Sequence, residues 1–359
     1  MTEWFPIDFR WTVRSKRFEP PNGGRRVKAW SFHDLMNVIL AIDGGGSRTR
    51  CVAFDECGNA LGSGESGPSN HLLVEDNTVA ASINDAISDA LAASNKSPGE
   101  VSLIAAGLAG VDYDGSGEPE MRELFRDLGY ANTLIEGDMV MAHSGALAGD
   151  PGVLALAGTG SSVLGIGQGG ERVKVGGWGP VFGDEGSAYR IGESALRAAA
   201  RDFDGRGPKT ALTEAITKSL KLSSFEGTVE AVYVKQMAPR EIALLSKTAY
   251  EVAGTGDEVA RGIFEMAGTE LAECVASAVV QLGPQDGNLK ISYEGSVIIS
   301  CELMRDSFCG YLSAKFPSVA ITRPRFSPVV GAYLLGRSGI GLDNDNDLLE
   351  KLEGRISNN

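Results

Sequence analysis

The chain has 359 residues, of which 43% are hydrophobic and 22% charged, and its formal net charge is -14. This composition excludes a wholly disordered chain, and the acidic balance argues against nonspecific binding to nucleic acid or anionic membranes. No apolar run reaches the roughly 18 residues that a membrane span needs, so we expect no transmembrane helix. The length predicts about two domains, and the five scattered cysteines without a CxxC pair suit a reducing, cytoplasmic setting.

Residues 1–35 differ from the rest of the chain. They hold seven Lys/Arg against four Asp/Glu, contain adjacent prolines and adjacent glycines, and show no clear hydrophobic period. Met36 follows and stands directly before an apolar run that is typical of a buried strand. We expect residues 1–35 to be a poorly ordered extension or a non-native start before Met36, with an arm packed on the body as the alternative.

The body shows one order of elements twice: three strands, then helix, strand, helix, strand and helix, with several helices at the first helical position of the second copy. The first copy occupies residues 36–148, with predicted strands 38–42, 49–54, 60–63, 101–106 and 133–136 and helices 74–93, 118–128 and 140–148. The second occupies residues 149–340, with predicted strands 153–157, 162–167, 172–175, 289–293 and 318–321, a helical stretch 185–283 and helices near 302–314 and 329–336. Residues 341–359 are expected to form a C-terminal tail. Such alternation predicts an α/β fold with two covered, mostly parallel sheets and a cleft between similar domains.

A glycine-rich turn follows the first strand of each copy. The turn residues are Gly44, Gly45, Gly46, Ser47 and Thr49 in the first copy, and Gly158, Thr159, Gly160 and Ser161 in the second. Glycines let the backbone approach an anion closely and point N–H groups at it, and the hydroxyls add donors. Either turn alone can be no more than a tight hairpin. Together, at equivalent places, they predict a site for the phosphates of a nucleotide.

Three aspartates stand where predicted strands end. Asp138 precedes a helix and is expected to face the cleft, where it could accept the proton of an attacking hydroxyl, although it could also only cap the helix. Asp43, just before the first glycine turn, is placed to hold Mg²⁺ through water. Asp112 is a second cleft candidate whose alternative role is that of a turn residue.

One further stretch combines glycines, an aromatic ring and paired acids. Gly177 and Trp178 precede Asp184 and Glu185, which stand before a predicted helix. Acids at a helix start can be complements to the helix dipole only, but a neighbouring tryptophan and paired acids are also what binds a sugar. Asn70 and His71, in the loop after the third strand, are expected at the same cleft, with His71 structural or in a supporting role.

These segments together resemble the N-acetylglucosamine kinase branch of the BadF/BadG/BcrA/BcrD ATPase family, within the actin-like sugar kinase superfamily. The resemblance covers about residues 38–340. Gly295 and Ser296 look like the family's adenosine segment, and Gly331 looks like its last glycine turn. The fold it implies is a pair of ribonuclease H-like domains, each a mixed five-stranded sheet with helices on both faces.

The resemblance also implies an activity, the phosphorylation of an amino sugar on its 6-hydroxyl by ATP with Mg²⁺. It implies Asp138 as the general base and the two glycine turns as phosphate loops. It places the sugar among Asn70, Thr159, Gly160, Asp184 and Glu185. Domain closure on the sugar would then limit wasteful ATP hydrolysis. Homodimers are common in the family.

Two positions depart from the vertebrate members. Leu72 stands where they have a tryptophan, and Ser162 where they have an asparagine. N-acetylglucosamine is the expected substrate, with glucosamine or an N-acetylmuramic acid derivative as the alternative. Two other readings are weaker: an ATPase that activates a dehydratase lacks the expected cluster cysteines, and a sugar-sensing regulator lacks a DNA-binding helix-turn-helix.

Overall fold

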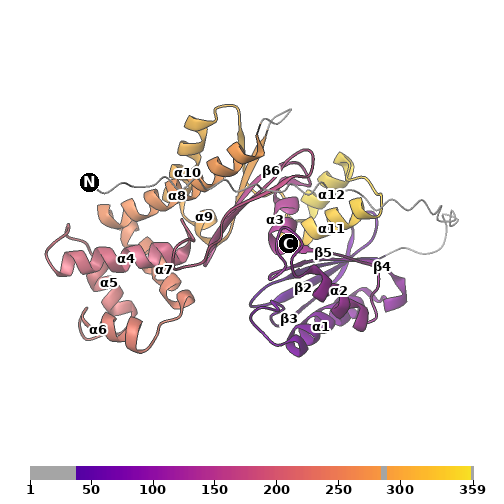
Figure 1. The fold of residues 1–359 in the computed structure, drawn as a ribbon, viewed down its shortest axis with the longest axis horizontal. Coiled ribbons are helices and arrows are strands. Elements are labelled where there is room, and N and C mark those ends of the chain that lie inside the picture. The colour runs from indigo at the N-terminus through magenta and orange to yellow at the C-terminus, as the bar shows by residue number, and fades with distance from the viewer. Residues whose placement is uncertain (1–37, 284–288, 357–359) are drawn as a thin grey trace, which may run out of the picture.

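The computed structural model describes residues 38–283 and 289–356, and it forms two lobes joined near the middle of the molecule (Figure 1). The expectation for residues 1–35 lies outside the described residues. Within them, no helix is both long enough and apolar enough to cross a membrane.

The first lobe is built on a five-stranded sheet with the order β3-β2-β1-β4-β5. Its strands are β1 (Val38–Gly44), β2 (Thr49–Phe54), β3 (Ala60–Ser66), β4 (Val101–Leu108) and β5 (Thr133–Gly137). β1 pairs antiparallel with β2 and parallel with β4, so β1 stands at the centre of a mixed sheet. β1 is almost wholly apolar because helices cover both of its faces.

The second lobe repeats this topology. Its sheet has the order β10-β9-β6-β7-β8, in which each strand takes the place of its counterpart in the first sheet. The strands are β6 (Gly152–Ala157), β7 (Ser161–Ile166), β8 (Arg172–Gly176), β9 (Lys290–Glu294) and β10 (Ala320–Thr322). The predicted duplication and the mixed five-stranded sheets are therefore confirmed.

Helices cover the sheets as the alternation of elements predicts. In the first lobe they are α1 (Asp76–Ser94), α2 (Glu118–Asp127) and α3 (Asp138–Leu147), with a 3₁₀ turn η1 (Pro98–Glu100). The helical stretch of the second lobe divides into α4 (Ala188–Phe203), α5 (Leu212–Ser219), α6 (Gly227–Val229), a π-helical turn η2 (Glu230–Val234), α7 (Pro239–Gly254) and α8 (Glu258–Leu282). α9 (Ser296–Ser300) and α10 (Glu302–Lys315) follow β9.

The C-terminal helices correct the expected domain boundary. α11 (Pro328–Gly339) and α12 (Asn346–Ile356) pack on the first sheet, on the right in Figure 1, and not on the second. The ring of Tyr333 stacks on Phe54 at 4.4 Å, and the Tyr333 hydroxyl donates to the Asp55 carbonyl oxygen at 3.0 Å. Leu348 and Leu352 of α12 are buried in the same cluster. Residues 341–359 therefore include a docked helix and are not only a tail.

Gly331 is the second correction. It lies inside α11, in agreement with the helix predicted at 329–336, whereas the family resemblance assigned it to a glycine turn. A Cβ at this position would stand 2.0 Å from the Met141 carbonyl oxygen and 2.4 Å from the Gly145 backbone nitrogen. Gly331 therefore permits close contact between α11 and α3, the two helices at the junction of the lobes.

Candidate active site

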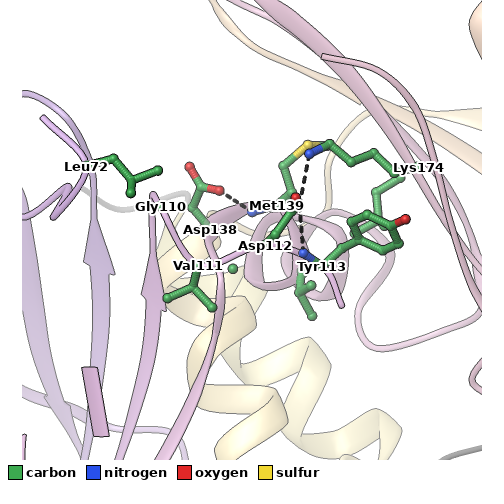
Figure 2. Close-up of a pocket in the computed structure, with 11 residues that line it drawn as sticks. Leu72, Gly110, Val111, Asp112, Tyr113, Asp138, Met139 and Lys174 are labelled. Atoms are coloured by element: carbon green, nitrogen blue, oxygen red, sulfur yellow. Dashed lines mark hydrogen bonds and ion pairs between the residues drawn. The ribbon is translucent and has the colours of Figure 1, made fainter. Parts of the chain in front are cut away.

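A cavity of about 240 Å³ lies between the lobes (Figure 2). Most of its walls come from the first lobe, from the loop after β4 and from the junction of β5 and α3. Leu164 of β7 and Lys174 of β8 complete it from the second lobe. The lining residues are Leu72, Gly110, Val111, Asp112, Tyr113, Gly137, Asp138, Met139, Val140, Leu164 and Lys174. The predicted inter-domain cleft therefore contains Asp138 and Asp112.

Asp138 is the first residue of α3, and Gly137 before it is the N-cap. One carboxylate oxygen accepts the Met139 backbone N–H at 2.8 Å, so the side chain is held at the helix N-terminus. Burial is the largest influence on the Asp138 carboxyl and raises its pKa above the ordinary value. A half-buried carboxylate with a raised pKa, aimed into a cavity, has the properties of a general base.

Lys174 stands opposite Asp138 in Figure 2. Its ammonium group donates to Asp112 Oδ1 at 2.9 Å and lies 5.6 Å from the centre of the Tyr113 ring. Lys174 lowers the pKa of Asp138, and Asp112 raises it. The pair thus places one positive and one negative charge beside the Asp138 carboxylate.

The two glycine turns occupy equivalent places, at the ends of β1 and β6. In the first, the Gly45 N–H donates to the Arg48 carbonyl oxygen at 2.9 Å, while Gly46 and Ser47 at the tip are exposed. In the second, the Gly158 N–H donates to the Gly160 carbonyl oxygen at 2.9 Å, and Thr159 is exposed. Both tips are therefore accessible to a ligand.

Two hydroxyls expected to contact phosphate are used inside the protein. Thr49 is fully buried, and its hydroxyl donates to the Gly67 carbonyl oxygen at 2.8 Å. The Ser161 hydroxyl donates to the Glu185 carbonyl oxygen at 2.7 Å. The expectation that these side chains contact phosphate is therefore wrong, because both fasten their turns to neighbouring loops.

Asp184 joins the second turn to the loop that contains Trp178. Its side chain is buried and accepts hydrogen bonds from the backbone N–H groups of Ser161 and Gly179. Burial raises the pKa of Asp184, and the two hydrogen bonds lower it by less. Its backbone has a φ of 59°, in the left-handed region that aspartate tolerates better than most residues. The ring of Trp178 is 69% exposed, and neither it nor Gly177, Asp184 or Glu185 lines the cavity.

Asn70 and His71 lie beside the loop after β4. Asn70 Oδ1 accepts the Leu72 backbone N–H at 3.0 Å. A Cβ on Gly110 would stand 2.7 Å from the His71 ring and 2.9 Å from Asn70 Oδ1, so both side chains pack on that glycine. This contact fits the supporting role expected of His71.

Asp43 and Glu294 bring carboxylates from both lobes to the same region. Burial raises the pKa of Asp43, and the charge of Asp138 adds to the effect. Burial likewise raises the pKa of Glu294 to about 7, with a further contribution from Asp43. Glu294 Oε2 is buried and has no hydrogen-bond partner among the described residues. Arg48 and Arg50 lower the pKa of Asp43 but do not cancel the effect of burial. Carboxylates brought together in this way fit a divalent cation.

Glu294 precedes Gly295 at the end of β9. Gly295 has a φ of 106°, and a Cβ there would stand 2.3 Å from the Ala157 carbonyl oxygen, so only glycine fits against the end of β6. Ser296 begins α9 and is exposed. The predicted adenosine segment therefore lies next to the second glycine turn.

The sequence analysis missed Lys174, Arg172 and Glu294. The two cations alternate along β8, which places both on one side of the strand, and this period was a usable signal. The signal for Glu294 was weaker: it is an acid at the end of β9, directly after three uncharged residues. Its proximity to Asp43 depends on how the lobes meet, which no local pattern predicts.

Comparison with known proteins agrees with this geometry. The model of the BadF/BadG/BcrA/BcrD ATPase family matches residues 40–336. The chain is 32% identical over 304 residues to an N-acetylmuramic acid/N-acetylglucosamine kinase of Clostridium acetobutylicum, covering 84% of this chain and 99% of the relative. It is 30% identical over 309 residues to an N-acetyl-D-glucosamine kinase of Dictyostelium discoideum, covering 83% and 97%.

Solved structures share the fold. A Chromobacterium violaceum protein, provisionally described as an N-acetylglucosamine kinase, has a TM-score of 0.65 at 24% identity and covers 84% of this chain and 98% of its own. A glucokinase of Streptomyces griseus, solved with glucose and AMPPNP, has a TM-score of 0.50 at 17% identity and covers 84% and 100%. With a family model that spans most of its length, the chain belongs to the BadF/BadG/BcrA/BcrD ATPase family.

Proposed function

We propose that the protein is a kinase that transfers the γ-phosphoryl group of ATP to the 6-hydroxyl of an amino sugar. The observation that carries this proposal is the position of Asp138, a half-buried carboxylate in a cavity between two duplicated domains. The cavity is small, which suits a sugar better than a large ligand. The names of the relatives from Clostridium acetobutylicum and Dictyostelium discoideum support the same class of substrate.

In the proposed reaction, the Asp138 carboxylate takes the proton of the sugar hydroxyl while its oxygen attacks the γ-phosphorus. The new O–P bond forms as the bond from that phosphorus to the bridging oxygen breaks, and ADP leaves. The exposed tips at Gly46 and Thr159 would bind the phosphates by backbone N–H groups. Asp184 would fix the second tip through Ser161.

Mg²⁺ is the metal that we propose for this site. Asp43 and Glu294 would hold it, since their carboxylates approach each other from the two lobes. The ion would neutralise the negative charge that the phosphates bring to an acidic cleft.

N-acetylglucosamine is the substrate that we propose first, with N-acetylmuramic acid and glucosamine as the next candidates. The direct test is ADP release with Mg·ATP and a panel of N-acetylglucosamine, glucosamine, N-acetylmannosamine, N-acetylmuramic acid and glucose. One sugar is expected to raise ADP release far above the blank without sugar. Equal release in every well would refute the proposal.

The activity of Asp138 is expected to depend on the charges beside it. A base acts only when ionised, so kcat/KM should fall as the pH drops through the pKa of Asp138. Lys174 lowers that pKa, so Lys174→Gln should move this acidic limb to higher pH. Asp112 raises it, so Asp112→Asn should move the limb to lower pH.

The measurement is the pH profile of kcat/KM between about pH 4 and 9, with the double variant placed between the two single variants. Lys235→Gln, which breaks an exposed pair with Glu230, is the control and should leave the limb in place. Shifts of the same sign in both single variants would contradict the assignment of Asp138 as the titrating base.

A further inference from the structure

β8 reaches across the lobe boundary with two cationic side chains. The Arg172 guanidinium donates to both carboxylate oxygens of Glu136 at 2.7 and 2.8 Å, and also to the Tyr113 carbonyl oxygen at 2.9 Å. Two residues on, Lys174 donates to Asp112 at 2.9 Å. Alternate residues of a strand share a face, so both bonds leave the same side of β8. We call this set of contacts the β8 clasp.

The clasp holds the two first-lobe segments that flank the base. Glu136 is in β5, two residues before Asp138. Asp112 and Tyr113 belong to the loop after β4 that forms the adjoining wall of the cavity. The two segments touch, since a Cβ on Gly137 would stand 2.6 Å from the Val111 carbonyl oxygen.

On the other lobe, β8 is joined to the second glycine turn. β7 begins at Ser161, the last residue of that turn, and β8 pairs with β7 from Ser162 to Ile166. A displacement of β8 is therefore passed to the turn through a hydrogen-bonded ladder. The clasp thus connects the segment that carries the base with the segment proposed to bind phosphate.

The ion pair between Arg172 and Glu136 is less exposed and more strictly oriented than an ordinary surface ion pair. The side chains of Arg172 and Glu136 are only 29% and 21% exposed, and two parallel N–H···O bonds fix their relative orientation. Exposed single pairs contribute little to stability or geometry. A lysine carries its donors on a single nitrogen and cannot reproduce the planar fork with two parallel bonds.

We infer that Arg172, supported by Lys174, is a positioning residue for phosphoryl transfer, which sets the Asp138 carboxylate relative to the phosphate turn of the other lobe. This inference rests on the proposed function. Neither side chain need touch the reacting atoms. The consequence is that loosening the clasp should slow the chemical step more than it weakens binding of either substrate.

The first test is the Arg172→Lys variant, which keeps the charge and removes the fork. We expect kcat to fall about 10-fold or more, with the KM values of ATP and sugar changed by less than about 3-fold. Glu136→Gln should lower kcat by a similar factor. The double variant should have a kcat only slightly lower than that of either single variant, because both substitutions remove the same contact. Arg197→Lys, in a pair with Glu193 inside α4, is the matched control and should retain full kcat.

The second test does not need turnover. Hydrogen–deuterium exchange of intact Arg172→Lys should be about 10-fold faster than wild type in peptides covering residues 133–139 and 109–114, and unchanged in α4. Unaltered kcat together with unaltered exchange would overturn the inference. So would a loss of kcat explained by a lower folded fraction or accompanied by an equal rise in KM. A wild-type protein that phosphorylates no sugar would refute the proposed function, while the exchange result would still decide whether the clasp holds the Asp138 segment.

Discussion

Asp138→Asn is expected to lower kcat by at least about 100-fold, the range for loss of a positioned general base. Asparagine has almost the same shape and can still accept the Met139 N–H, so the start of α3 should be retained. An amide cannot take the proton of the sugar hydroxyl. The KM of ATP should change little, because Asp138 belongs to the start of α3 and not to either of the glycine turns proposed to bind phosphate. Steady-state kinetics with the best sugar of the panel, together with a melting curve, provides the measurement.

The control for this variant is Asp76→Asn. Asp76 is also an acid in the first turn of a helix, α1, but it is exposed and does not line the cavity. If Asp138 only complements the helix dipole, both variants should lose similar stability, about 0.3–1 kcal/mol, and neither should lose activity. Near-normal turnover of Asp138→Asn would transfer the base to Asp112 or Asp184.

The sequence predicted the two sheets well because their strands are local patterns. β2 was placed with its observed bounds, and β1 and β6 differ only by residues at their ends. Each is an apolar run that ends at a glycine turn, and a central, doubly covered strand requires such a run. The repeated order of elements then sufficed to predict the duplication and the cleft.

Packing between distant segments was not predictable in this way. α12 has an amphipathic pattern, but its docking on the first sheet depends on Gly58, whose missing Cβ leaves room for Leu348. Gly331 was assigned to a glycine turn because of the resemblance to the family, and its close contact with α3 is not visible in the sequence. Thr49 was assigned to phosphate because a hydroxyl in a turn has no visible partner until the loop at Gly67 folds over it.

The same limit applied to the site. Asp138 and Asp112 were identified because strand ends in such folds face the cleft, and the cavity contains both. Lys174 and Arg172 act on the opposite lobe, 62 and 36 residues from Asp112 and Glu136 in sequence. Their partners follow from how the two lobes meet, which no single segment encodes.

Asp184→Asn is expected to raise the KM of the sugar about 10- to 100-fold, the effect of losing one charged hydrogen-bond acceptor. The carboxylate accepts N–H groups from Ser161 and Gly179 and so fixes two loops at once. An amide oxygen carries no net charge and accepts hydrogen bonds less strongly than a carboxylate, so both contacts should weaken. Asparagine tolerates the left-handed backbone at this position, so backbone strain should not contribute. The KM of ATP should rise less, because the glycine turn keeps the bond from Ser161 to the Glu185 carbonyl.

Asp257→Asn separates this effect from general loss of stability. Asp257 is the N-cap of α8 and likewise accepts two backbone N–H groups, from Ala260 and Ala211, but within the helical insertion. Both variants should therefore lower the melting temperature by comparable amounts, since each leaves a donor less well satisfied. Only Asp184→Asn should change the sugar KM. Equal KM values in the two variants would show that Asp184 stabilises the fold without organising the sugar site, and the paired acids before α4 would then be helix-start residues alone.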